Sequence, residues 1–209
     1  TTHYVSIQLG IGGFQPMSAS EVCRTNFGDC KALSNYLKAL LNVAGIPSNY
    51  CTIILDDREK YLIPDYPNFQ QMNHVILQVP LPDGTLYLEC TNPKTPFGFV
   101  HNNISGHDGL ICTKEGGKIE RLPDYADSLN IDQNSAIVTV EPDGHATVKL
   151  KKQWMVKVYD DHAGFSLMKK TDQSDLLRKE INLPNVTMGA IQVTEDKSPE
   201  PKLTINHTW

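Results

Sequence analysis

The chain has 209 residues, which is enough for one large domain or two small ones. Its formal net charge of -5 gives no reason to expect nucleic acid or an anionic membrane surface as a partner. Hydrophobic residues make up 40% of the chain, yet no apolar run approaches the roughly 18 residues of a membrane span, so the composition is that of a globular protein.

The N-terminal segment "TTHYVSIQLGIGG" has no basic region followed by an apolar stretch, so it does not resemble a signal peptide. Its "GIGG" at residues 10–13 lacks the strand–loop–helix context of a phosphate-binding loop, and we predict a turn there. The chain lacks an initiator methionine, and its last residues, "KLTINHTW", resemble the middle of a strand. We therefore expect a fragment of a longer protein with flanking domains.

The clearest element is a helix in "FGDCKALSNYLKALLNVAGI", residues 27–46. Asp29 is a good N-cap residue, and Gly45 suits the position just beyond the helix end. Apolar residues recur at steps of three and four, which predicts one apolar face and a helix buried in the middle of a domain: Ala32, Leu33, Tyr36, Leu37, Leu40, Leu41 and Ala44. Cys30 then lies in the first helical turn.

Cys30 has four possible roles: core residue, half of a disulfide, metal ligand or nucleophile. The chain has five cysteines with no C-x-x-C pair, which argues against a structural zinc site and does not require a disulfide: Cys23, Cys30, Cys51, Cys90 and Cys112. The N–H groups at a helix start favour a thiolate and can stabilise an oxyanion. Packing alone also places small apolar cysteines at such positions, so Cys30 by itself leaves both interpretations open.

After the helix, "NYCTIILD" predicts a strand, and "DREKYLIPDYPNFQQ" predicts a loop with two prolines. Two hairpins follow. The first, "NHVILQVPLPDGTLYLECTNP", turns around Pro82-Asp83-Gly84. The second, "GLICTKEGGKIERLP", is predicted to turn at Gly116-Gly117.

The first hairpin places a histidine and a carboxylate near one another. If Pro80 faces Thr85, then His74 faces Thr91, and Glu89 is a diagonal neighbour on the same face, about 7–8 Å away at the backbone. Glu89 could then orient the imidazole while its other nitrogen faces a thiol. A register slip of one residue would move Glu89 to the opposite face.

The other histidines carry less chemistry. His101 and His107 lie in the polar loop "FVHNNISGHDG", which offers too few ligands for a metal site, and we expect His145 and His162 to be solvated. We expect no metal and no organic cofactor. Three N-x-S/T triplets would accept glycans only in a secreted eukaryotic protein; they begin at Asn103, Asn185 and Asn206.

The second half of the chain has a different texture. The polar stretch "LPDYADSLNIDQN" predicts a boundary, with one domain over residues 1–125 and another over residues 132–209. The second domain contains a predicted hairpin around Pro142-Asp143-Gly144, a helical pattern in "SDLLRKEINLP" and two further strands. We predict an α+β chain whose C-terminal domain is a small, truncated β-sandwich.

Three motifs resemble the transglutaminase-like (papain-like) superfamily. "FGDCKALSNYLKALLNVAGIPSNY" is similar to its G-D-C helix, "NHVILQV" to its histidine strand, and "YLECT" stands where members usually have W-h-D-P-T. The resemblance implies a Cys-bearing helix packed on an antiparallel sheet. It also implies Cys30 as nucleophile, His74 as base and Glu89 as orienting acid, with no cofactor. Glu89 departs from the more common aspartate.

The flanking stretches "LGIGGFQP" and "LECTNPKTPFGFV" resemble bacterial proteins that carry a transglutaminase-like core between β-sandwich domains. Such proteins are often exported, which implies a periplasmic or cell-envelope location. The implied function is thiol-dependent acyl transfer on a peptide or protein substrate, foremost as a protease or amidase. The alternatives are a crosslinking transglutaminase and a binding or scaffold module without turnover.

The implied mechanism also needs donors for an oxyanion. The backbone N–H of Cys30 would be one donor, and the side chain of Gln8 or Gln15 is a candidate for the second.

Overall fold

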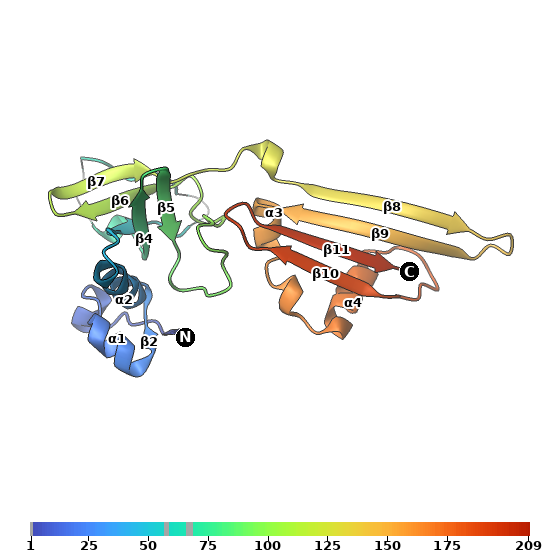
Figure 1. Ribbon diagram of the computed structural model, residues 1–209, viewed down its shortest axis with the longest axis horizontal. Helices are drawn as coiled ribbons and strands as arrows, with labels where there is room; N and C mark the ends of the chain where they lie inside the picture. The colour runs from blue at the N-terminus through green and yellow to red at the C-terminus, as the bar shows by residue number, and fades with distance from the viewer. Residues whose placement is uncertain (1, 57–58, 66–68) are drawn as a thin grey trace. The chain divides into compact units, whose positions relative to one another are not determined.

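The computed structural model describes residues 2–56, 59–65 and 69–209. The chain divides into two compact units, Thr1–Asp124 and Tyr125–Trp209 (Figure 1). The loop predicted over residues 57–71 lies partly outside the described residues. Both units combine helices with antiparallel sheets, so the predicted α+β class is confirmed.

The N-terminal unit contains a five-stranded antiparallel sheet with the order β5-β4-β3-β6-β7. The strands in chain order are β3 (Asn49–Ile53), β4 (His74–Leu81), β5 (Gly84–Leu88), β6 (Asp108–Thr113) and β7 (Gly116–Arg121). Two helices precede the sheet, α1 (Ala19–Thr25) and α2 (Cys30–Val43), and a short parallel pair joins β1 (His3–Tyr4) to β2 (Phe27–Gly28). The "GIGG" segment forms a 3-10 turn, Gly10–Gly13.

Helix α2 is buried along only part of its length. Ala32 and Leu33 pack with Val22 of α1, and Leu37 and Leu41 pack partly against β4 and β5. The second half of the helix is more open, since Leu40 is 49% exposed and Val43 is 87% exposed. The predicted apolar face is present, but the expectation of a helix buried in the middle of a domain is wrong for the second half of α2, because α1 and one sheet face cover only part of its circumference.

The β4–β5 hairpin has the register that the sequence predicted, with Pro80 opposite Thr85. The ladder ends at the pair Leu77 and Leu88, so Glu89 follows the last residue of β5. In the β6–β7 hairpin the pairing of Thr113 with Gly116 leaves residues 114–115 as the turn. The predicted turn at Gly116-Gly117 is shifted, because both glycines belong to β7.

The C-terminal unit contains one four-stranded antiparallel sheet with the order β10-β11-β9-β8. Its strands are β8 (Asp132–Val140), β9 (Ala146–Met155), β10 (Ile191–Asp196) and β11 (Lys202–Thr208), and its helices are α3 (Lys157–Asp161) and α4 (Lys170–Lys179) (Figure 1). The core joins sheet and helical residues: Trp154, Tyr159, Phe165, Leu177, Leu203 and Ile205.

The predicted β-sandwich is therefore corrected: within the fully described C-terminal unit, helical segments cover the sheet and no second sheet is present. The alternating pattern of a strand shows that one face is buried, but it does not tell whether a sheet or a helix covers that face. Among the described residues of the whole chain, no helix is long and apolar enough to cross a membrane.

Candidate active site

The start of α2 is built by three consecutive residues with different tasks. Asp29 is the N-cap, and its carboxylate accepts a hydrogen bond from the Ala32 N–H at 2.9 Å and pairs with Lys31. A Cβ at Gly28 would lie 2.8 Å from the Ala32 Cβ, so only glycine lets the chain approach the helix this closely. Cys30 then takes the first helical position and is buried.

Side chains on both partners hold this helix start against the sheet. The Ser34 hydroxyl donates to the carbonyl of Val75 at 3.2 Å, and the Tyr50 hydroxyl donates to the carbonyl of Lys31. Val75 directly follows His74 in β4. Ser34, one helical turn after Cys30, is thus hydrogen-bonded to the residue that follows His74. This bond holds the start of α2 close to the start of β4.

His74 lies between the other two predicted residues. Its Nε2 is 2.8 Å from Glu89 Oε2, and a hydrogen bond to the Cys30 side chain is among the causes that raise its pKa. Burial by itself lowers the pKa of His74, but the hydrogen bonds to Cys30 and Glu89 and the negative charge of Glu89 outweigh it and raise the pKa to about 9. The structure therefore brings Cys30, His74 and Glu89 together, with a charged imidazole beside the thiol at neutral pH.

Glu89 is held at both carboxylate oxygens. Its Oε1 accepts hydrogen bonds from the Thr91 N–H at 2.7 Å and from the Thr91 hydroxyl at 2.6 Å. Burial raises the pKa of Glu89, but hydrogen bonds from His101, His74 and Thr91 and the charge of His74 hold it well below the usual range. Glu89 is therefore ionised at neutral pH. It lies just past the end of β5, and from there its glutamate side chain reaches the His74 ring.

His101 is a site residue that the sequence analysis missed. Its Nε2 lies 3.3 Å from Glu89 Oε2, the same oxygen that contacts His74. It lies in an irregular segment twelve residues after Glu89, where no periodicity predicts which way a side chain points. Our only interpretation of His101 was as a poor metal ligand, and the linear sequence holds no signal that would have paired it with Glu89.

The helix start offers one oxyanion donor. The N–H groups of the first helical turn have no intrahelical acceptor, and among the described residues nothing accepts from the Cys30 N–H. The predicted second donors lie apart from it: Gln8 and Gln15 are exposed, and the Gln8 amide donates to the Ser6 hydroxyl at 3.3 Å. No described contact joins either glutamine to Cys30, and that assignment stays a prediction.

All five cysteines are free thiols. Burial raises the pKa of Cys51 to about 12 and that of Cys90 to about 11. Cys23 and Cys112 are exposed. Within the described residues Cys30 thus combines burial at a helix start with a charged imidazole partner, whereas the raised pKa values keep the buried Cys51 and the partly buried Cys90 protonated at neutral pH.

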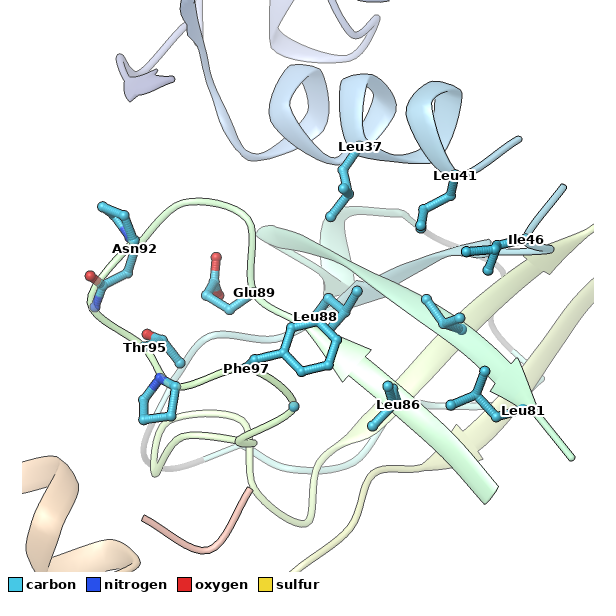
Figure 2. Close-up of a pocket in the computed structure, with 14 residues that line it drawn as sticks. Leu37, Leu41, Ile46, Leu81, Leu86, Leu88, Glu89, Asn92, Thr95 and Phe97 are labelled. Carbon is cyan, nitrogen blue, oxygen red and sulfur yellow. The ribbon is translucent and has the colours of Figure 1, made fainter. Parts of the chain in front are cut away.

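An apolar groove of about 550 Å³ adjoins this cluster (Figure 2). Figure 2 shows Leu37 and Leu41 of α2 on one side, Leu86 and Leu88 of β5 across from them, and Phe97 from the loop that follows. The Glu89 side chain lines one end, where Asn92 and Thr95 add polar atoms. The groove can accept an apolar segment next to the carboxylate that holds His74.

The described residues contain no group of three His, Cys, Asp or Glu side chains that could hold a metal ion. His107, which shares the loop with His101, is buried, and its Nδ1 lies 2.9 Å from the carbonyl oxygen of Ile54. It therefore serves the structure of the loop and lies outside the cluster around Glu89.

Comparison with known proteins gives the class. Residues 7–90 match the family model of the transglutaminase-like superfamily. The matched range runs from before α1 to just past the end of β5 and includes Cys30, His74 and Glu89. The N-terminal unit therefore contains a transglutaminase-like core, and the resemblance seen in the sequence is confirmed at the level of the superfamily.

The comparison with solved structures finds a match to a protein from Parabacteroides distasonis described as a "putative protease". It shares 9% sequence identity at a TM-score of 0.46, over 100% of this chain and 44% of that one. The chain thus spans less than half of that protein's length. No curated protein matches the sequence.

Proposed function

We propose that the N-terminal unit catalyses thiol-dependent acyl transfer on peptide or carboxamide bonds, with Cys30 as nucleophile, His74 as general base and acid, and Glu89 as the orienting carboxylate. The observation that carries the proposal is the position of His74, which is hydrogen-bonded to the Cys30 thiol and to the Glu89 carboxylate at once. Nucleophile, base and orienting group within hydrogen-bond reach is the signature of nucleophilic catalysis.

In this mechanism the thiol proton resides on His74, and the Cys30 sulfur attacks the carbonyl carbon of the substrate. The new C–S bond pushes the carbonyl electrons onto oxygen, and the Cys30 N–H at the start of α2 donates to that oxyanion. Collapse of this intermediate breaks the C–N bond, and His74 gives its proton to the leaving amine. The product is an acyl-thioester on Cys30.

The second half of the cycle decides the class of enzyme. Water attacking the thioester, with His74 accepting its proton, releases a carboxylic acid and restores the thiol, which is hydrolysis. A primary amine attacking instead forms a new amide, which is crosslinking. The groove is apolar and Glu89 lines its polar end, but Cys30 and His74 do not line it, so it can serve only as a subsite for an apolar substrate side chain away from the reacting bond. The cell-envelope location stays a prediction.

The first test is the pH dependence of iodoacetamide alkylation at Cys30, read by peptide mass spectrometry in the wild type and in His74→Ala. A free thiol reacts in proportion to its thiolate, which forms near pH 8.5. We expect a rate at Cys30 that is already high near pH 6 and that falls at least about tenfold in His74→Ala. Cys51 and Cys90, whose pKa values are raised by burial, are internal controls that stay unlabelled.

A rate that rises only near pH 8.5 and ignores His74 would overturn the proposal and leave a binding module with a silent site. If Cys30 is primed, a peptide carboxamide library incubated with and without a fluorescent primary amine separates the two reactions. Acid products without amine incorporation indicate a hydrolase, whereas incorporation that depends on Cys30 indicates a crosslinking enzyme.

A further inference from the structure

The second histidine on Glu89 is held by a well-packed loop. The carbonyl of His101 accepts hydrogen bonds from the N–H groups of Ile104 at 3.1 Å and Ser105 at 2.9 Å. Phe99, Val100 and Ile104 are each no more than 3% exposed. The side chain of His101 is itself only 14% exposed. The segment is irregular, but its packing and its turn fix the direction of the imidazole.

The contacts of Glu89 account for the usual acceptor capacity of a carboxylate. Oε1 receives the N–H and the hydroxyl of Thr91, and Oε2 lies 2.8 Å from His74 Nε2 and 3.3 Å from His101 Nε2. An ionised carboxylate can only accept, so each histidine must donate its Nε2–H. The four donors approach from three separate segments, which leaves Glu89 a single orientation in which Oε2 faces His74.

We propose that His101 is a positioning residue of the site: its Nε2–H anchors Glu89 Oε2 so that this oxygen stays aligned with the His74 imidazole. The inference rests on the proposed function, because it assigns His101 to the unit that orients the base. His101 has no described contact with Cys30, so it acts through Glu89. Without that donor, Oε2 can rotate away from His74, and the imidazole loses the restraint that points its other nitrogen at the thiol.

Two variants separate the hydrogen bond from the ring. His101→Phe keeps a flat ring of similar size and removes the donor, whereas His101→Gln restores an N–H donor on a flexible side chain. Ile104→Val is the matched control, because it loosens the packing of the same loop without removing a hydrogen bond. Protection of the buried Cys51 from alkylation confirms that each variant is folded; if His101→Phe fails this check, the smaller His101→Leu replaces it.

The decisive measurement is the proton NMR resonance of the His74 Nε2–H, which is protected from solvent exchange by its bond to Glu89. If His101 had only a structural role in its loop, this resonance would stay unchanged in the variants. We expect this resonance in the wild type, its loss or broadening in His101→Phe, and its recovery in His101→Gln. The alkylation rate of Cys30 at pH 6 is expected to fall about three- to tenfold in His101→Phe and to stay within twofold of wild type in His101→Gln.

An unchanged His74 resonance in His101→Phe would overturn the inference, as would equal broadening in Ile104→Val, since loop packing would then explain the effect. The experiments distinguish a failure of the proposed function from a failure of the role assigned to His101. If wild-type Cys30 is not primed and ignores His74, the proposed function fails. The resonance still reports whether His101 positions Glu89.

Discussion

Two buried histidines, one in each unit, show that partners and not burial decide the charge of an imidazole. His74 is 8% exposed and contacts a carboxylate and a thiol, which raises its pKa to about 9. His207 of β11 is 4% exposed, and within the fully described C-terminal unit neither of its ring nitrogens has a hydrogen-bond partner. Burial, followed by the charge of Lys152, lowers the pKa of His207 below its ordinary value.

The different surroundings of His74 and His207 distinguish a candidate active site from a structural position. The N-terminal cluster keeps two opposite charges buried and gives each of them hydrogen bonds, which is costly unless the geometry is used. The C-terminal unit buries a histidine in its neutral form, without a hydrogen-bond partner and near the ion pair of Lys152 and Glu180. A perturbed pKa of a buried histidine therefore indicates chemistry here only where a carboxylate is hydrogen-bonded to the ring, as Glu89 is to His74.

Removal of the Glu89 carboxylate is the change with the largest expected effect. In Glu89→Gln the imidazolium of His74 loses its counter-charge, and breaking one side of a buried ion pair typically costs about 3–5 kcal/mol. We expect the free energy of unfolding of the N-terminal unit to fall by about 3 kcal/mol and Cys30 alkylation at pH 6 to fall at least about tenfold. Urea unfolding followed by circular dichroism measures the first effect.

The matched control is Glu120→Gln. Glu120 also lies in the sheet and accepts a hydrogen bond from Gln78 at 2.7 Å, but it is partly exposed and pairs with an exposed lysine. We expect a loss below about 1 kcal/mol for this variant. Equal losses in the two variants would mean that the Glu89 pair has no special role in the fold.

The pH dependence of stability should differ in sign between the two units. For His74 the folded pKa of about 9 lies above the unfolded value of about 6.5, so its contribution is complete below pH 6.5 and is lost as the pH rises through 9. We expect a loss on the order of 3 kcal/mol from the N-terminal unit over this range, and a flatter profile in His74→Gln.

The two transitions can be followed separately in one sample. Both tryptophans, Trp154 and Trp209, lie in the C-terminal unit, so their fluorescence reports that unit alone. Circular dichroism reports both units. A wild-type profile in which the N-terminal transition is as stable at pH 9 as at pH 6 would contradict the raised pKa of His74.

His207 should give the opposite slope. Its lowered folded pKa means that the stabilisation by a neutral ring is complete above about pH 6.5 and is lost as the pH falls below it. We expect His207→Leu to abolish this acid sensitivity and to be neutral or stabilising by up to about 1 kcal/mol at pH 7.5, since it removes two unpaired buried nitrogens. Tryptophan fluorescence in urea at pH 7.5 and 5.5 measures this.

His145→Leu is the control for that measurement, because His145 lies in the exposed turn between β8 and β9 with its side chain 85% exposed. It should leave both the stability and its pH slope within about 0.5 kcal/mol of wild type. Persistent acid sensitivity in His207→Leu would assign the slope to another group of the C-terminal unit.

The sequence could predict the parts of the site that local rules determine. A capped helix start fixes Cys30, and the turn of the β4–β5 hairpin fixes a register that carries His74 toward Glu89. His101 could not be predicted, because its direction depends on the packing of an irregular loop around Phe99 and Ile104. The sandwich prediction failed for a related reason: strand periodicity shows a buried face without showing what covers it.

The smallest expected effect concerns the groove beside Glu89. Phe97 is 67% exposed on its wall, so Phe97→Ser removes apolar surface without disturbing the core. If the acyl donor lies in this groove, a thiol-reactive peptide reagent with a leucine side chain should inactivate Cys30 faster than its serine analogue. Loss of the Phe97 contact should reduce that preference about fivefold, which corresponds to about 1 kcal/mol.

Leu167→Ser is the matched control, because Leu167 is 57% exposed in the C-terminal unit and should leave the preference unchanged. Iodoacetamide, which has no side chain to place in the groove, should react equally with wild type and Phe97→Ser. A leucine preference that survives Phe97→Ser would exclude this wall from the path of the acyl donor. Specificity would then have to arise at the start of α2, where the His74 imidazole faces Cys30.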